Sequence, residues 1–299
     1  MSIKLPKIHL DSSDPAETKK AKGLIGYLDG QTTNPSLVAN NPDIKKRLDE
    51  GKKLTEKELL DFYKQVVQEI EKEVAGPISV EVNANWESTA ADLLKQAENM
   101  FTWGKNIHIK FPTIPAGLEA ANQFLKNGGR VNMTLVFTQE QAAAVYTATL
   151  KAQSPSFLSP FIGRWDDRGF DGMDLVKNTL KMYRKFHSLP GGKNENLKGK
   201  MHVLMLAASI RSLDHFYASI ALGADIMTVP MKILEQWIHE EQWIPDEHYR
   251  APSKGLKSIV YKDLPFNPDF KSYDVSKEDG SLLDEGLKKF SADWQKLLQ

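Results

Sequence analysis

Short apolar or β-branched runs alternate along this chain with longer segments of helical periodicity. Eight such runs occur in order, with the sequences IHLD, GYLDG, ISVEV, IHIKF, RVNMTLVF, SFLSPFIG, HVLMLAA and DIMTV. Strands that alternate with helices are joined by right-handed crossovers and pair in parallel. The order of these segments therefore predicts an α/β protein built on a parallel sheet.

Capping patterns predict where several of the helices begin and end. Thr55 and Glu58 have the spacing of a capping box, and Thr138 stands at the start of QEQAAAVYTATLKA. Pro15 suits the first turn of a helix that Gly23 is expected to end, because glycine commonly terminates helices. The segments between the predicted strands are thus long enough to be crossover helices.

Two parallel architectures compete for this pattern, a closed barrel and an open doubly wound sheet. Eight strand–helix units within 299 residues favour closure. No G-x-G-x-x-G turn or P-loop follows a predicted strand, which weakens the open, nucleotide-binding sheet. We therefore expect a single (β/α)8 TIM barrel domain over residues 1–299, with an irregular excursion at about 242–280 and a last helix at 281–299.

Composition limits the partners and the compartment. Lys plus Arg and Asp plus Glu both number 39, so no bulk charge indicates nucleic acid or an anionic membrane. The chain has no cysteine, which excludes disulfides and thiolate metal sites. It has no signal-peptide core and no apolar run of about 20 residues. The expectation is a cytoplasmic protein that binds neither nucleic acid nor membrane.

Lys110 stands inside a predicted strand. Side chains alternate across a strand, so the three apolar residues of IHIKF share one face, while His108 and Lys110 share the other. Lys110 then points into the barrel, where an apolar setting lowers the pKa of a lysine and makes its neutral amine a nucleophile toward carbonyls. The alternative is a surface lysine on an edge strand. The alternation of the strand favours burial.

Polar residues recur where the interior and the carboxyl rim of a barrel are expected. Strand alternation puts Glu81 on one inward face, and Asn132 and Thr134 on another. The predicted strands end near further polar side chains, namely Asp11, Asn34, Ser159, Ser209 and Arg211. Barrel enzymes gather their catalytic groups on that rim, although Asp11 and Asn34 are equally compatible with helix or turn capping.

Six motifs then indicate a family. LDGQTTNPSLV, SVEVNAN, IHIKFP, VNMTLVF, LSPFIGR and AASIR resemble transaldolase motifs in the family's order, over about residues 9–230. The resemblance implies an α/β barrel whose fourth strand carries a Schiff-base lysine, which corresponds to Lys110. It also implies that Asp11 handles the proton of the substrate hydroxyl, and that Glu81 and Thr134 position a water for proton transfer.

The resemblance also implies how the substrate is held. The residues that correspond to the binding site of the three-carbon unit are Asn34, Asn132 and Ser159, and those that correspond to the phosphate site are Arg164, Ser209 and Arg211. Arginine suits phosphate because its planar fork makes paired hydrogen bonds. The implied reaction transfers dihydroxyacetone from sedoheptulose 7-phosphate or fructose 6-phosphate to glyceraldehyde 3-phosphate or erythrose 4-phosphate, in the pentose phosphate pathway. It needs no metal and no cofactor.

Other readings stay open at this point. The first predicted strand lies near the start of the sequence, as in the short branch that contains fructose 6-phosphate aldolase, but Glu81 and Phe161 match transaldolases where that aldolase has glutamine and tyrosine. A sugar-phosphate-binding barrel without catalysis is a further alternative. A metal-dependent barrel hydrolase is weaker, because His108, His202 and His215 lack metal-binding spacing. The amphipathic last helix suggests a possible homo-oligomer.

Overall fold

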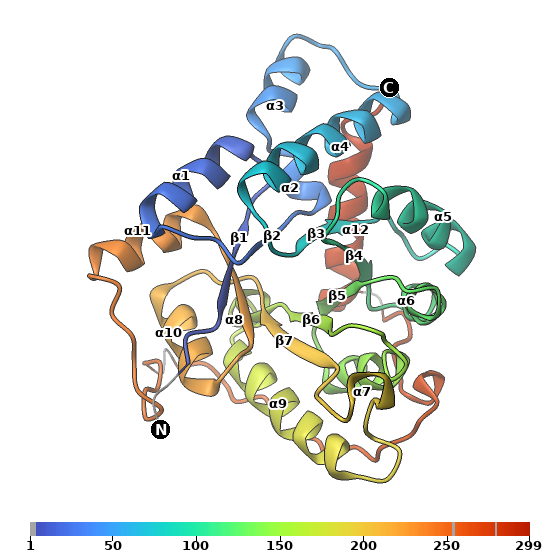
Figure 1. Ribbon diagram of the computed structural model, residues 1–299, viewed down its shortest axis with the longest axis vertical. Coiled ribbons are helices and arrows are strands. Elements are labelled where there is room, and N and C mark those ends of the chain that lie inside the picture. The colour runs from blue at the N-terminus through green and yellow to red at the C-terminus, as the bar shows by residue number, and fades with distance from the viewer. Residues whose placement is uncertain (1–3, 253–254, 279) are drawn as a thin grey trace.

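A computed structural model describes residues 4–252, 255–278 and 280–299 as a closed barrel of parallel strands, which pair in sequence order from β1 to β8 and back to β1 (Figure 1). The prediction of a (β/α)8 TIM barrel is confirmed. The strands are β1 Lys7–Asp11, β2 Gly30–Thr32, β3 Ile78–Glu81, β4 Ile107–Pro112, β5 Val131–Val136, β6 Ser156–Pro160, β7 Val203–Ala207 and β8 Ile226–Val229.

Helices surround the barrel and cap its carboxyl end (Figure 1). Thr55 with Glu58 forms the capping box that their spacing predicted, and Thr138 caps α7 as expected, in a second capping box with Gln141. The helices are α1 Pro15–Ile25, α2 Pro35–Ala39, α3 Pro42–Asp49, α4 Glu56–Glu73, α5 Ala90–Phe101, α6 Pro115–Lys126, α7 Gln139–Ala148, α8 Ile162–Asp166, α9 Gly172–Ser188, α10 Leu213–Leu222, α11 Met231–His239 and α12 Leu282–Gln295, with 3₁₀ turns at Glu195–Leu197 and Phe270–Ser272.

Two predicted boundaries near the start of the chain are wrong. Helix α1 runs through Gly23 and ends at Gly26, which has the left-handed φ of 82° that a helix C-cap needs. The second strand begins only at Gly30, so most of the run GYLDG is a connection. The pairing of β2 with β1 begins at Gly30, which lies opposite His9. A Cβ at Gly30 would lie 2.4 Å from His9 Nε2, so this position suits glycine. A single glycine inside a helix costs only about 1 kcal/mol, which is why Gly23 does not end α1.

The main core lies between the strands and the surrounding helices, and a second layer of side chains fills the barrel interior. Ile109 and Phe111 are fully buried on the outward face of β4. On the inward face, the His108 ring stacks on Phe157 of β6 with ring centroids 4.4 Å apart, and His9 of β1 meets the same ring edge-on. These three rings come from strands that are not neighbours, so they pack across the interior and close it below Lys110.

The excursion at 242–280 follows the outside of the barrel. Gln139 of α7 hydrogen-bonds both the Val260 carbonyl and the Lys262 amide, and Asn178 of α9 donates to the Ile259 carbonyl. The residues described in this excursion do not line the pocket at the barrel mouth. They connect α11 to α12 along the far side of α9 and α7.

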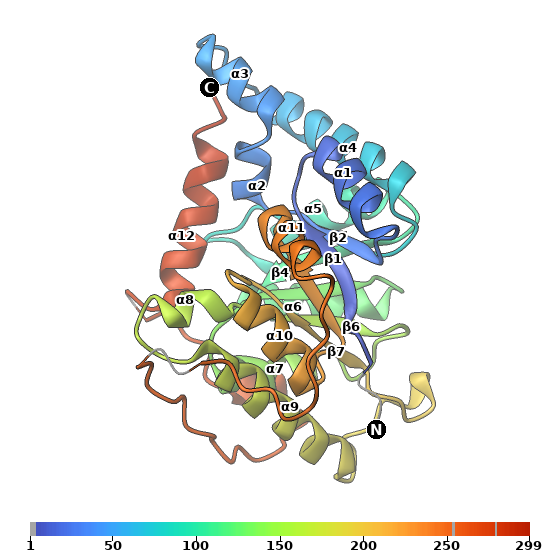
Figure 2. The same ribbon diagram turned by 90° about the vertical axis from the view of Figure 1, so that its left-hand side faces the viewer.

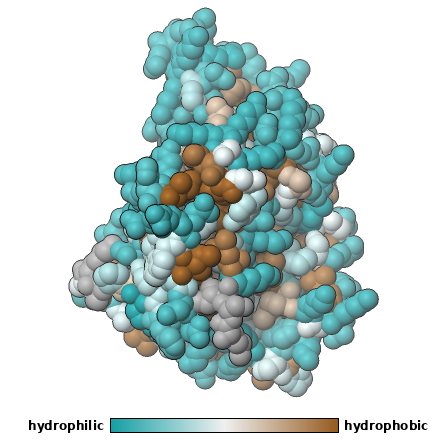
Figure 3. Space-filling model, turned by 60° about the vertical axis from the view of Figure 1, so that its left-hand side comes forward, coloured by the Kyte–Doolittle hydropathy of each residue, from teal (hydrophilic) through white to brown (hydrophobic). Residues whose placement is uncertain are grey.

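Helix α12 lies across the carboxyl end of the barrel, beside α2 (Figures 1 and 2). Its apolar residues Leu287 and Trp294 are buried against the chain's own barrel, so the amphipathic pattern that suggested a partner subunit is satisfied within this chain. The face that Figure 3 shows is mainly hydrophilic, with a few apolar areas. Within the described residues, no helix combines the length and the apolar character needed to cross a membrane.

Candidate active site

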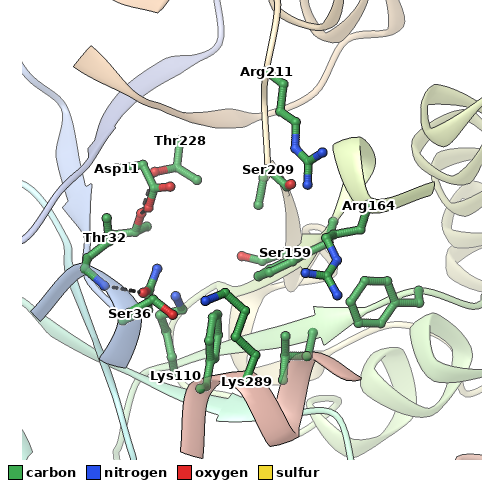
Figure 4. A pocket seen from close by; sticks show the side chains of 18 residues that line it. Asp11, Thr32, Ser36, Lys110, Ser159, Arg164, Ser209, Arg211, Thr228 and Lys289 are labelled. Carbon is green, nitrogen blue, oxygen red and sulfur yellow. Dashed lines mark hydrogen bonds between the residues drawn. The ribbon is translucent and has the colours of Figure 1, made fainter. Parts of the chain in front are cut away.

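A pocket opens at the carboxyl end of the barrel, between the strand ends and α12 (Figure 4). Its walls come from the ends of seven strands and from α2, α8 and α12. The lining residues are Asp11, Thr32, Asn34, Ser36, Leu37, Lys110, Leu135, Phe137, Ser159, Phe161, Arg164, Ala208, Ser209, Arg211, Thr228, Gly286, Lys289 and Phe290. Eight of these are site residues that the sequence predicted, namely Asp11, Asn34, Lys110, Ser159, Phe161, Arg164, Ser209 and Arg211.

The other three predicted residues, Glu81, Asn132 and Thr134, are buried and do not line the pocket. Glu81 lies against Lys110, and Asn132 lies beneath Ser159, which donates a hydrogen bond of 2.7 Å to its amide oxygen. Asn132 in turn donates to Ser79, so one buried network joins β3, β5 and β6. The Thr134 carbonyl accepts from the Thr113 hydroxyl at 2.8 Å. These residues support the floor of the pocket.

Lys110 is the centre of the site. Its side chain is about 5% exposed, and Nζ lies 2.8 Å from Glu81 Oε2 and 3.0 Å from the Thr33 carbonyl oxygen that accepts its hydrogen bond. The strand register explains the pairing, because β3 and β4 place Glu81 directly opposite Lys110. The apolar setting expected for Lys110 is therefore wrong: an acidic partner stands beside the amine.

The two carboxylates near Lys110 have perturbed pKa values. Burial raises the pKa of Glu81, and the positive charge of Lys110 opposes part of that shift. Burial likewise raises the pKa of Asp11, opposed by Lys110 and by a hydrogen bond of 2.8 Å from the Thr32 hydroxyl. Buried carboxylates with raised pKa values beside a lysine are suited to accepting and returning protons.

The capping alternatives for Asp11 and Asn34 have different outcomes. The N-cap of α1 is Asp14, whose side chain accepts from the Ala16 amide, so Asp11 is not the cap. Asn34 does cap α2, because its Oδ1 accepts from the Leu37 amide at 2.9 Å. The same residue lines the pocket, and the two roles are compatible because the cap uses only the side-chain oxygen.

Two arginines stand on the side of the pocket formed by α8 and the end of β7 (Figure 4). Arg164 Nη2 lies 3.4 Å from Glu285 Oε2, and Arg211 Nη1 lies 2.5 Å from Asp167 Oδ1. Gly163 lets Arg211 pass close to α8, because a Cβ there would lie 2.6 Å from Arg211 Cδ. The two guanidinium groups present donors suited to a phosphate.

Two of the five described non-glycine residues with a left-handed φ stand at this pocket. Leu135 and Ser209 both line it, and both have left-handed φ values, 55° and 57°. Such a conformation costs a residue other than glycine about 1–3 kcal/mol, and it persists where the surroundings impose it. Phe161 also contributes to the wall, with its ring edge-on to Phe137 and to Phe290 of α12.

Sequence reasoning missed a layer of residues around these groups. Thr32 and Thr228 line the pocket from strand ends, Ser36 from α2, and Lys289 and Phe290 from α12. Only the position of Thr228, near the end of the predicted strand DIMTV, gave a signal in the sequence. The others depend on how β2, α2 and α12 meet at the mouth.

Tyr63 supports the site from behind. Its hydroxyl, carried by α4, lies 2.5 Å from Thr33 Oγ1 and accepts a hydrogen bond of 3.1 Å from the Glu81 amide. Burial raises the pKa of Tyr63 well above its ordinary value, so the phenol stays protonated. Thr33 and Glu81 are the two residues that contact the Lys110 amine, and one phenol therefore fixes both.

The histidines take local roles. His202 contacts the Tyr146 carbonyl through Nε2, and His215 Nε2 lies 2.8 Å from Asp166. In the part of the chain that the structure describes, no group of three or more His, Asp or Glu side chains is arranged to hold a metal ion.

The fold and the pocket together define a parallel α/β barrel enzyme with a lysine, two carboxylates and two arginines at its carboxyl end. The sequence matches the Transaldolase/Fructose-6-phosphate aldolase family over residues 8–299, and the chain belongs to this family.

The chain is also similar to several proteins named probable transaldolase. The relative from Roseiflexus sp. (strain RS-1) is 35% identical over 77% of this chain and 88% of its own length. That from Alkaliphilus metalliredigens (strain QYMF) is 36% identical over 77% and 89% of the two chains. That from Bdellovibrio bacteriovorus is 30% identical over 85% and 95%. These relatives extend over most of the barrel.

Proposed function

We propose that this protein is a transaldolase, which transfers a dihydroxyacetone unit between sugar phosphates through a Schiff base on Lys110. The observation that carries the proposal is the buried Lys110–Glu81 pair, at 2.8 Å, at the floor of a pocket that also presents Asp11 and two arginines. Family membership and relatives named probable transaldolase support the same class of reaction.

The first half of the reaction begins with a proton transfer from Lys110 to Glu81, which leaves a neutral amine. The amine adds to the ketone carbon of fructose 6-phosphate or sedoheptulose 7-phosphate, and the ketone oxygen leaves as water. The product is an iminium, which serves as an electron sink. Glu81 on β3 and Thr134 on β5 belong to the two strands that flank β4, and in this proposal they hold the water that carries protons during formation and hydrolysis of the Schiff base.

The second half breaks and remakes a carbon–carbon bond. Asp11 takes the proton of the substrate hydroxyl next to the bond, the bond electrons move toward the iminium, and an aldose phosphate leaves as the aldehyde. The dihydroxyacetone unit stays on Lys110 as an enamine. It then attacks the aldehyde carbon of glyceraldehyde 3-phosphate or erythrose 4-phosphate, Asp11 returns its proton to the new alkoxide, and water releases the product.

The remaining residues bind the substrate. Asn34, Asn132 and Ser159 suit the hydroxyls of the three-carbon unit, since their amide and hydroxyl groups surround Lys110 or lie directly beneath the pocket floor. Arg164, Ser209 and Arg211 stand farther along the pocket and suit the phosphate. The reaction belongs in the pentose phosphate pathway of the cytoplasm in this proposal.

Fructose 6-phosphate aldolase is the second candidate, because the family includes it. An aldolase would release dihydroxyacetone after the first bond cleavage instead of transferring it. Glu81 and Phe161 favour transfer, since they match the transaldolase pattern at two positions where that aldolase has glutamine and tyrosine.

Borohydride trapping tests the proposal. The enzyme is incubated with fructose 6-phosphate and borohydride, and the adduct is located by intact mass and peptide mapping, beside a Lys110→Ala control. We expect a reduced dihydroxyacetone adduct on Lys110 that the control lacks. Addition of erythrose 4-phosphate before reduction separates the candidates, because a transaldolase converts the enamine to sedoheptulose 7-phosphate. The absence of an adduct with any ketose phosphate would overturn the proposal.

A further inference from the structure

One cation of the pocket has no role in the proposed reaction. The charged residues that line the pocket are Asp11 and four bases, Lys110, Arg164, Arg211 and Lys289. Lys110 is paired with Glu81 at the floor, and the two arginines form the phosphate site. Lys289 comes from α12, outside the barrel proper, and it reaches into the same pocket (Figure 4).

The position of Lys289 is fixed by contacts on both sides of it along α12. On one side, Trp86 Nε1 donates to Asp284 at 2.9 Å, and Gly286 packs so closely on β5 that a Cβ would lie 2.9 Å from Leu135. On the other side, the Ser36 hydroxyl donates to Asp293. Because α12 is held at both points, the backbone of Lys289 is fixed beside the pocket.

The amine of Lys289 is held only by a weak and exchangeable contact among those described. Nζ lies 2.9 Å from Asp293 Oδ2, four residues along the helix, and the Lys289 side chain is 53% exposed. The Asp293 side chain is 13% exposed, and an i,i+4 pair whose cation is exposed contributes little to stability. Asp293 keeps the Ser36 hydroxyl when the amine leaves, so little is lost if Nζ turns toward a ligand.

The acids that balance these cations stand outside the pocket lining. Glu285 contacts Arg164, Asp167 contacts Arg211 and Asp293 contacts Lys289, but none of the three acids lines the pocket. A bound ligand therefore meets the cations and not their partners. Such a field favours a dianion over a neutral sugar.

We propose that Lys289 is a substrate-binding residue that contacts the phosphate of the sugar phosphate together with Arg164 and Arg211, an inference that rests on the proposed function. Its ammonium leaves Asp293 and donates to a phosphate oxygen. Helix α12 thus supplies part of the specificity for phosphorylated substrates.

A purely structural role predicts something different. If the Lys289–Asp293 pair only stabilises α12, its loss lowers the melting temperature and leaves substrate affinity unchanged. Lys288 provides a matched control, because it makes the same kind of pair with Asp284 on the same helix but does not line the pocket.

The experiment compares Lys289→Ala, Lys289→Arg and Lys288→Ala with the wild-type chain. For Lys289→Ala we expect the KM for fructose 6-phosphate to rise roughly tenfold, the size expected for loss of a charge-assisted hydrogen bond, with a smaller change in kcat. Trapping of free dihydroxyacetone on Lys110 should be unaffected. Lys289→Arg should restore most of the affinity, and Lys288→Ala should match the wild type.

Calorimetric titration with inorganic phosphate separates this inference from the proposed function, since it needs no chemistry at Lys110. Weaker phosphate binding by Lys289→Ala supports the inference even if the wild-type chain forms no adduct, in which case only the proposed function fails. Wild-type turnover with an unchanged KM in Lys289→Ala overturns the inference. Equal losses for fructose 6-phosphate and free dihydroxyacetone overturn it as well.

Discussion

His108 and Lys110 lie two residues apart on the same inward face of β4, yet their surroundings differ in kind. His108 is stacked between the walls of the barrel against Phe157, and burial lowers its pKa to about 4, while that of His9 falls to about 3. Lys110 faces Glu81 at 2.8 Å and opens to the pocket. The lower layer holds rings that fill space, and the upper layer holds the ionisable groups at the pocket floor.

This difference shows how one strand can serve stability and chemistry in adjacent layers. The lower layer excludes water from beneath the site, so that the charges above it interact strongly. The ionisable groups of the upper layer have partners within hydrogen-bonding reach, as Glu81 has Lys110 and Asp11 has Thr32. Substitutions in the upper layer should therefore change mainly activity, and substitutions in the lower layer mainly stability.

The largest effect in the upper layer is expected from Glu81→Gln. The amide cannot take the Lys110 proton, so the rate of adduct formation in a single turnover should fall about 100-fold or more. In the wild type the rate should decline as the pH falls through the raised pKa of Glu81, and this acid limb should be altered in the variant. An unchanged adduct rate would show that Glu81 is not the proton acceptor. A shift of products toward free dihydroxyacetone would indicate aldolase chemistry.

Arg211→Ala should act next most strongly, on binding. We expect the KM for phosphorylated donors to rise by about tenfold or more, because the guanidinium fork suits phosphate, while free dihydroxyacetone should still react. Arg168 is the matched control, since it also pairs with a carboxylate near α8 but does not line the pocket. Equal losses with both substrates would contradict the phosphate assignment.

Tyr63→Phe sharpens the comparison by removing support from behind the upper layer. The lost phenol hydroxyl positions Thr33 and Glu81, so kcat should fall several-fold with KM unchanged, and stability should fall by about 1 kcal/mol. Tyr183→Phe removes another buried hydroxyl, which donates to the Ala142 carbonyl away from the site. It should cost similar stability without affecting kcat. If both variants retain full kcat, Tyr63 only stabilises the fold.

His108→Phe should have the smallest effect on activity and should change the pH dependence of stability instead. The folded pKa of about 4 lies below the ordinary 6.5, so unfolding takes up a proton between these values and stability declines as the pH falls through that window. Phenylalanine keeps the stack on Phe157 but cannot take up a proton. Urea unfolding from pH 7 to pH 4 should show a shallower loss in the variant, and an identical slope would contradict the assignment.

The sequence predicted the barrel and the inward direction of Lys110, because both follow from the periodicity of side chains within single segments. It did not predict that Glu81 stands opposite Lys110, since the register between strands is set by the whole sheet. It placed the end of the first helix at Gly23 and not Gly26, because composition does not show which glycine adopts a left-handed φ. Lys289 was missed because only the packing of α12 on β5 and α2 brings it to the mouth.

The contacts of helix α12 join residues that lie much farther apart in the sequence than most contacts at the site do. Apart from the β1–β8 pair that closes the barrel, the strands pair with neighbours in sequence, whereas α12 meets Trp86 across 198 residues and Ser36 across 257. Contacts between distant segments carry a high entropic cost and tend to form late in folding. We therefore expect that the barrel folds first, with Lys110 at a mouth that α12 does not yet cover. Docking of α12 then completes the wall of the pocket. The backbone amides of α12 should therefore exchange with solvent faster than those of the strands.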